Sequence, residues 1–146
     1  MLNIGEIMKG RRRLPHRPPE REAEIEKAQI LVIDDEPSVA DALKLILEDE
    51  GYRVAVALTG REGLELTRRR CFDVVVSDVR LPDVSGLDVL RDVRRGCPAS
   101  VVILITSHVT TNLLAEARGG GAFDVLHKPF IPSDVLRLVS AALDRI

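Results

Sequence analysis

The feature that most constrains the fold of this chain is a regular alternation between short apolar runs and longer amphipathic stretches. Five runs rich in Val, Ile and Leu lie at residues 30–33, 52–57, 73–77, 101–105 and 123–127. Continuous apolar runs of this length, with many β-branched residues, are typical of strands that are buried on both faces. Buried strands that alternate with helices indicate a parallel sheet covered by helices on both sides.

The stretches between the apolar runs carry the signals that start and end helices. Pro37 suits the first turn of a helix that ends before Gly51. Thr59 and Glu62 have the spacing of a capping box. The expected helices lie at residues 37–50, 59–70, 86–94, 109–118 and from 132 to the chain end. The helix at 109–118 is the weakest of them, because it opens with Val, Thr and Asn, which are mediocre helix formers.

Five strands and five helices with right-handed crossovers predict a flavodoxin-like, doubly wound α/β fold with strand order 2-1-3-4-5. We expect residues 30–146 to form this domain and residues 1–29 to be a mobile N-terminal extension. The extension has seven Lys/Arg and five Glu, whereas residues 30–146 have fourteen Lys/Arg and eighteen Asp/Glu. A domain with a net negative charge argues against direct binding of nucleic acid, although the basic cluster at 9–13 could touch an anionic surface.

The sequence also indicates the cellular compartment in which the protein works. No apolar run approaches the roughly 20 residues that span a bilayer, and no signal peptide precedes the basic cluster at 9–13. The two cysteines, Cys71 and Cys97, have no metal-binding spacing and do not suggest a disulfide framework. We therefore expect a protein of the reducing cytoplasm that makes no membrane contact.

Polar residues follow four of the five predicted strands at the point where each strand ends. Asp34 and Asp35 follow the first strand, Asp78 the third, Thr106 the fourth and Lys128 the fifth. Each residue alone could merely cap a helix or sit in a turn. Carboxyl ends of parallel strands share one edge, however, and ligands bind there near the point where the strand order reverses. Three carboxylates at one place need a cation, and Mg²⁺ prefers such hard oxygen ligands.

The same segments resemble the receiver domains of two-component response regulators. The resemblance covers residues 30–146, about four-fifths of the chain, and its motifs lie at 30–36, 77–87, 105–107 and 121–130. The segment around Asp78 is similar to receivers of the nitrogen-regulation group of transcription factors.

The resemblance implies a role for each acidic residue of the cluster. Asp78 matches the phosphoacceptor, which attacks the phosphorus of a phosphohistidine or of a small phosphodonor. Asp35 and Asp78 match side-chain ligands of Mg²⁺, and Asp34 matches a ligand that acts largely through water. Arg80 matches the position whose backbone carbonyl completes the metal site.

The resemblance also implies a switch. Thr106 matches the hydroxyl that moves to bond a phosphoryl oxygen, and Lys128 matches the ammonium that pairs with Asp78 and then with the phosphoryl group. Pro129 matches a position where the preceding peptide bond is commonly cis. Val125 stands where receivers usually carry Tyr or Phe, which leaves the aromatic half of the usual switch in doubt.

The implied function is a phosphorelay switch without turnover of an external substrate. Its partners would be a histidine kinase or phosphotransfer protein, docking on the first helix and on the loop after Phe130, and a downstream protein target. The target would bind the surface of the helix at 109–118, the strand at 123–127 and the last helix, through which a homodimer could also form. The chain would be either a stand-alone receiver or part of a longer regulator.

Three other functions share parts of this pattern. A phosphorylation-independent interaction domain would tolerate Val125 but would not need the charged cluster. A phosphatase of the haloacid-dehalogenase type expects Asp-x-Asp-x-Thr after the first strand, which residues 34–37 do not provide. A flavin-binding flavodoxin expects a phosphate loop rich in Ser, Thr and Gly at the same place, where acidic residues would repel the cofactor.

Overall fold

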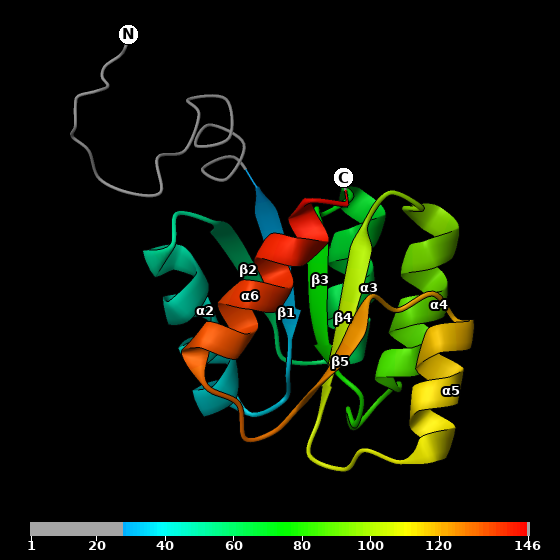
Figure 1. The fold of residues 1–146 in the computed structure, drawn as a ribbon. Helices are drawn as coiled ribbons and strands as arrows, with labels where there is room; N and C mark the ends of the chain where they lie inside the picture. Colours follow the sequence, from blue (N-terminus) through cyan, green and yellow to red (C-terminus); the bar gives the residue numbers. More distant parts are fainter. Residues whose placement is uncertain (1–27, 146) are drawn as a thin grey trace, which may run out of the picture.

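A computed structural model describes residues 28–145 of the chain, and within this range it confirms the flavodoxin-like α/β fold (Figure 1). The sheet has the order β2-β1-β3-β4-β5, with every neighbouring pair parallel. The strands are β1 (Gln29–Ile33), β2 (Arg53–Ala57), β3 (Val74–Asp78), β4 (Val101–Thr106) and β5 (Asp124–His127). The helices are α2 (Pro37–Asp49), α3 (Gly60–Arg69), α4 (Gly86–Gly96), α5 (Thr111–Gly119) and α6 (Pro132–Leu143).

Helices cover both faces of the sheet and enclose two hydrophobic cores. In β1, Ile30 and Val32 face the core that is completed by α2 and α6. Leu31 and Ile33 alternate with them and face the second core, to which α4 and α5 contribute buried side chains. Figure 1 shows α2 and α6 together on one side of the sheet and α4 and α5 on the other. The inner strands lack polar alternation because both of their faces are buried.

The ends of α2 and α3 follow the sequence signals. Pro37 opens α2, and Gly51 ends it with a φ of 103°, a conformation in which glycine avoids a steric penalty. Thr59 caps α3 by accepting a hydrogen bond from the backbone N of Glu62 at 3.0 Å. The Glu62 carboxylate reaches back to the backbone N of Leu58, one residue before the position that a capping box would use.

The helix predicted at residues 109–118 starts later than expected. Thr110 is its N-cap and accepts a hydrogen bond from the backbone N of Leu113 at 3.0 Å, so α5 begins at Thr111. The glycines after it form its C-terminal cap: Gly121 has a φ of 90° and its N bonds the carbonyl of Arg118. The sequence alone gave no reason for this run of glycines.

The predicted N-terminal extension falls largely outside the described residues. Its last two residues do not: Ala28 is buried, and Gln29 begins β1, so the folded domain starts before residue 30. No helix among residues 28–145 is long and apolar enough to cross a membrane.

The two cysteines did not suggest a disulfide framework from the sequence, and this expectation is wrong. Cys71 and Cys97 are joined by a disulfide, with their Cα atoms 5.7 Å apart. A sequence separation of 26 residues gives no hint of this contact. The pairing arises because α3 and α4 pack side by side, which brings the residues that follow the end of each helix together.

Candidate functional site

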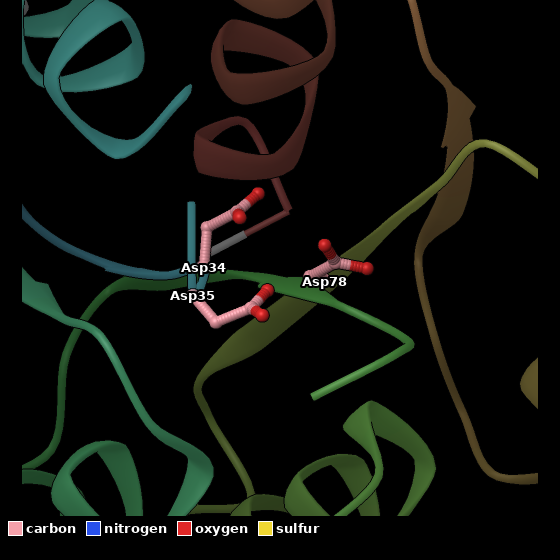
Figure 2. Close-up of side chains that lie close together, drawn as sticks. All are labelled: Asp34, Asp35 and Asp78. Atoms are coloured by element: carbon pink, nitrogen blue, oxygen red, sulfur yellow. The ribbon is translucent and has the colours of Figure 1, made fainter. Parts of the chain in front are cut away.

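Three carboxylates gather at the edge of the sheet where the carboxyl ends of the parallel strands meet, as the sequence predicts. Asp34 and Asp35 directly follow β1, and Asp78 is the last residue of β3, the neighbouring strand. One carboxylate oxygen from each of the three lies within 4.8 Å of the others. Figure 2 shows the side chains of Asp34, Asp35 and Asp78 clustered beyond these strand ends. Asp34 and Asp78 are buried and Asp35 is exposed, so the cluster opens to solvent on one side.

Lys128 is the cation of this cluster. Its Nζ lies 2.8 Å from Asp78 Oδ2, 2.9 Å from Asp34 Oδ2 and 3.2 Å from Glu36 Oε1. Its backbone N donates to the carbonyl of Thr106 at 2.8 Å, which fixes the lysine at the end of β5. The sequence predicted the pairing with Asp78. It did not predict Glu36, whose exposed carboxylate adds a third acceptor.

The ionisation of the cluster follows from burial and charge. Burial raises the pKa of Asp34, and the Glu36 backbone N–H and the Lys128 ammonium offset this only in part, while the negative charge of Asp78 adds to it. Burial alone would lower the pKa of Lys128. The hydrogen bond to Asp78 and the close negative charges of Asp78 and Asp34 outweigh that effect and raise the pKa of Lys128 above its ordinary 10.5.

The acidic cluster suits a divalent cation. Asp34 Oδ1 accepts a hydrogen bond from the backbone N of Glu36 at 2.9 Å. Asp34 Oδ2 is buried without a hydrogen bond, because its approach to Lys128 Nζ is an ion pair without hydrogen-bond geometry. The Lys128 ammonium compensates the charge of this oxygen, but a carboxylate oxygen has a further lone pair that remains without a partner. Mg²⁺ coordination would satisfy it, and the all-oxygen donor set is the one that Mg²⁺ prefers.

Asp78 is held by the loop that follows it. Its Oδ1 accepts a hydrogen bond from the backbone N of Arg80 at 3.0 Å, while Oδ2 binds Lys128. The backbone N of Val79 donates to the carbonyl of Ile105 at 2.9 Å, which fastens the start of this loop to β4. Arg80 therefore lies beside the acids as predicted, with an exposed side chain. The metal-binding role of its carbonyl stays a prediction.

Thr106 and Val125 occupy different places relative to the acids. Thr106 is 1% exposed, and its Oγ1 accepts a hydrogen bond from the backbone N of His108 at 3.1 Å. This bond links the predicted switch hydroxyl to the loop that leads into α5. Val125 is half-buried and packs against the core beneath α4 and α5. It belongs to that hydrophobic core and not to the charged cluster.

Asp83 positions the loop that follows Asp78, and the sequence did not predict this role. Its carboxylate accepts hydrogen bonds from the backbone N of Arg61 at 2.9 Å, of Gly60 at 3.0 Å and of Val84 at 2.9 Å. The hydrogen bond from Arg61 is the main reason that the pKa of Asp83 lies below its ordinary value. Asp83 thus holds the first turn of α3 against the loop that follows Asp78. No local pattern signals it, since α3 is more than twenty residues away in sequence.

Comparisons with known proteins agree with this geometry. The family model described as the response regulator receiver domain matches residues 30–140. The alginate biosynthesis transcriptional regulatory protein AlgB of Pseudomonas aeruginosa is 38% identical over 115 residues, covering 79% of this chain and 25% of the relative. The transcriptional regulatory protein ZraR of Klebsiella oxytoca is 36% identical over 104 residues, covering 71% of this chain and 24% of the relative. The chain thus spans about a quarter of the length of these relatives.

Solved structures give the same result. A receiver domain protein from Clostridium thermocellum is 36% identical with a TM-score of 0.77, covering 81% of this chain and 95% of that one. The beryllofluoride-activated NtrC4 receiver domain dimer is 36% identical with a TM-score of 0.76, covering 80% of this chain and 96% of that one. The chain therefore belongs to the response-regulator receiver domains of two-component systems, and it is similar to those of NtrC-type transcriptional regulators.

Proposed function

We propose that this receiver accepts a phosphoryl group on Asp78 from a histidine kinase or phosphotransfer protein in a Mg²⁺-dependent reaction. One observation carries the proposal: Lys128 Nζ binds Asp78 Oδ2 at 2.8 Å inside a cluster of three carboxylates. A partly buried ammonium on one side, and on the other a group of acids that can hold a divalent cation, would supply positive charge on two sides of a transferring phosphoryl group.

The proposed reaction is a direct transfer between two side chains. An oxygen of Asp78 forms a bond to phosphorus while the bond from phosphorus to the donor's imidazole nitrogen breaks, and the imidazole keeps that electron pair. Lys128 is placed to follow the new charge, since its ammonium already lies between Asp78 and Asp34. Bound by Asp34, Asp35, Asp78 and the Arg80 carbonyl, Mg²⁺ would neutralise charge on the phosphoryl oxygens. Hydrolysis of the phosphorylated Asp78 would reset the receiver, and we expect no turnover of an external substrate.

The proposed response runs from Thr106 to α5. A phosphoryl group on Asp78 offers new acceptor oxygens, and the Thr106 hydroxyl can donate to one of them. Because the Thr106 oxygen also accepts from the backbone N of His108, a shift of Thr106 toward the phosphoryl group would move the loop before α5. Only Leu113 and Ala117 are buried in α5, so this helix can shift at low cost. The surface of α5, β5 and α6 would change and control a downstream protein or a homodimer.

The phosphodonor is expected to dock beside α2. A groove of about 380 Å³ is lined by Ser38 and Ala42 of α2 and by Pro129 and Phe130 beyond β5, and it reaches Lys128. The side chain of Ile131 next to it is 58% exposed. A partner that covers Phe130 and Ile131 beside this groove would bring a phosphohistidine toward Asp78. A kinase partner of this kind would place the protein in the cytoplasm.

A phosphorylation-independent interaction domain is the second candidate, and Val125 favours it. Valine has no aromatic ring that could turn with the state of Asp78, and Val125 packs against the hydrophobic core instead. The charged cluster argues against this candidate, because three clustered carboxylates repel one another and the single Lys128 ammonium does not balance their charge.

The two candidates are separated by treatment with acetyl phosphate and by titration with beryllofluoride, each with Mg²⁺ and with a chelator. We expect Mg²⁺-dependent formation of an aspartyl phosphate, detected as a mass increase. Asp78→Asn should abolish it, and the matched control Asp41→Asn, at an exposed position of α2, should not. A wild-type protein that responds to neither reagent would overturn the proposed function and leave the second candidate.

A further inference from the structure

The Cys71–Cys97 disulfide lies at the opposite edge of the sheet from the acidic cluster. Cys71 precedes β3, whereas Asp78 is the last residue of that strand. Cys97 is the C-cap of α4, and its Sγ lies 3.8 Å from the carbonyl oxygen of Thr67 in α3. The disulfide therefore ties the end of α3 to the end of α4, and the receiver chemistry at Asp78 does not use it.

Polar contacts also join α3 to the segment that contains α4. Asp83 holds the first turn of α3 through the backbone N of Gly60 and of Arg61. Arg68 of α3 forms an exposed ion pair with Asp92 of α4 at 3.5 Å. Exposed pairs of this kind stabilise only weakly. The disulfide is therefore the strong link at this end of the two helices, and opening it would leave the other end in place.

The fold does not depend on this bond for its core. Val89, Leu90 and Val93 hold α4 to the sheet, and each is at most 1% exposed. Phe72, next to Cys71, is also buried. With the sulfurs reduced, these contacts remain, so we expect the dithiol form to stay folded and the change to be reversible.

Access to the bond is uneven. Cys71 is exposed and Cys97 is 6% exposed, so an incoming thiolate can reach the sulfur of Cys71. Arg68, Arg69 and Arg70 directly precede Cys71 and are exposed, which favours the approach of an anionic thiolate. Accessible disulfides of this kind exchange with thiols, whereas enclosed ones resist.

We propose that Cys71–Cys97 is a thiol–disulfide exchange site whose redox state sets how firmly α4 is held to α3. A dithiol reductant provides the electrons. One of its thiolates attacks Cys71 Sγ, and Cys97 leaves as a thiolate that takes up a proton. The second thiol of the reductant then displaces Cys71, so that two electrons and two protons end on the cysteines and the reductant becomes a disulfide. The proposal does not rest on phosphorylation of Asp78.

The test begins with the full chain equilibrated in glutathione buffers and quenched by alkylation, with the fraction of modified cysteine read by mass. The ratio of reduced to oxidised glutathione is varied over about 100-fold or more. We expect the oxidised form of the protein at one end of this range and the dithiol form at the other. Free thiols at every ratio would overturn the proposal. So would a disulfide that excess dithiothreitol opens only after the protein has been unfolded.

Hydrogen exchange tests whether the disulfide holds the end of α4 to the end of α3. In the reduced protein, amides in the last turns of α3 and α4 should exchange about tenfold faster or more than in the oxidised protein, while those amides of α2 that exchange by local opening, and not by global unfolding, stay unchanged. Equal rates in both forms would overturn the claim that the bond holds the two helices together. Cys71→Ser, at the exposed position, should show the reduced-state rates under all conditions, and Cys97→Ser provides a second variant.

A final measurement checks that the two sites are separate. The affinity for beryllofluoride with Mg²⁺ should agree within about twofold between the oxidised and reduced protein, since the bond touches none of the acids. A change of about tenfold or more would refute this separation. A protein that binds no beryllofluoride in either state would contradict the proposed function and leave the redox result intact.

Discussion

Gly86→Ala is the substitution whose effect the structure defines most sharply. Gly86 is the first residue of α4, and its backbone N donates to the carbonyl of Val79 at 2.8 Å. A Cβ at this position would lie 2.3 Å from the carbonyl oxygen of Asp78 and 2.8 Å from the Cα of Val79. Both atoms belong to the backbone, so no side-chain rotation can relieve the clash.

The size of the effect follows from the distance that must open. Contacts of a Cβ below 3.0 Å essentially do not occur, so α4 and the loop after Asp78 must separate by the difference between 3.0 and 2.3 Å. Overpacking of this kind typically costs about 1–3 kcal/mol. For a domain of this size, that loss corresponds to a fall in Tm of about 4–12 °C. Because the moving atom is the carbonyl of Asp78, transfer from acetyl phosphate should also slow by about tenfold or more.

Thermal unfolding followed by circular dichroism measures the stability change, and Gly96→Ala is the matched control. Gly96 is the last residue of the same helix, and a Cβ there would meet nothing within 4 Å. The control should unfold at the wild-type Tm or above it, with a gain of at most about 1 kcal/mol from helix propensity. If Gly86→Ala were as stable as Gly96→Ala, the argument from the close backbone approach would be wrong.

Three further predictions concern the charged cluster and the disulfide. Mg²⁺ at ten times its Kd should stabilise the folded protein by about 1.4 kcal/mol in urea unfolding, and Asp34→Ala should remove most of this gain. In metal-free protein, the raised pKa of Lys128 contributes stability that is fully present below pH 10.5 and is lost as the pH rises further. The urea midpoint of the wild type should therefore fall more steeply above pH 10.5 than that of Lys128→Met. Equally steep falls in both proteins would contradict this. Reduction of Cys71–Cys97, with its separation of 26 residues, should lower the unfolding free energy by about 3.5 kcal/mol on chain entropy. A reduced protein with an unchanged Tm would refute that value.

The sequence predicted the sheet and the acidic cluster because both follow from local patterns. Apolar runs mark buried strands, and residues directly after parallel strands share one edge, so the sequence alone predicts that Asp34, Asp78 and Lys128 lie together. Contacts between distant segments carry no such signal. The Lys128–Glu36 ion pair joins residues 92 positions apart, and the Asp83 cap of α3 spans more than twenty.

The sequence did not predict the disulfide or the start of α5, for two different reasons. Two cysteines without a recognisable spacing say nothing about pairing until the packing of α3 against α4 is known. The start of α5 was set too early because Val109 and Thr110 have side chains that a helix tolerates. The Thr110 hydroxyl instead accepts from the backbone N of Leu113, which makes it a cap and excludes Val109 from the helix.

The two hydrophobic cores on either side of the sheet share no buried side chain. Substitutions in one layer should therefore leave packing in the other nearly unchanged, and their effects on stability should add. The layer of α2 and α6 includes the groove proposed for the phosphodonor, whereas the other layer holds the Cys71–Cys97 bond and α5. With such a division, substitutions that alter the proposed phosphodonor groove should leave the proposed response of α5 unchanged.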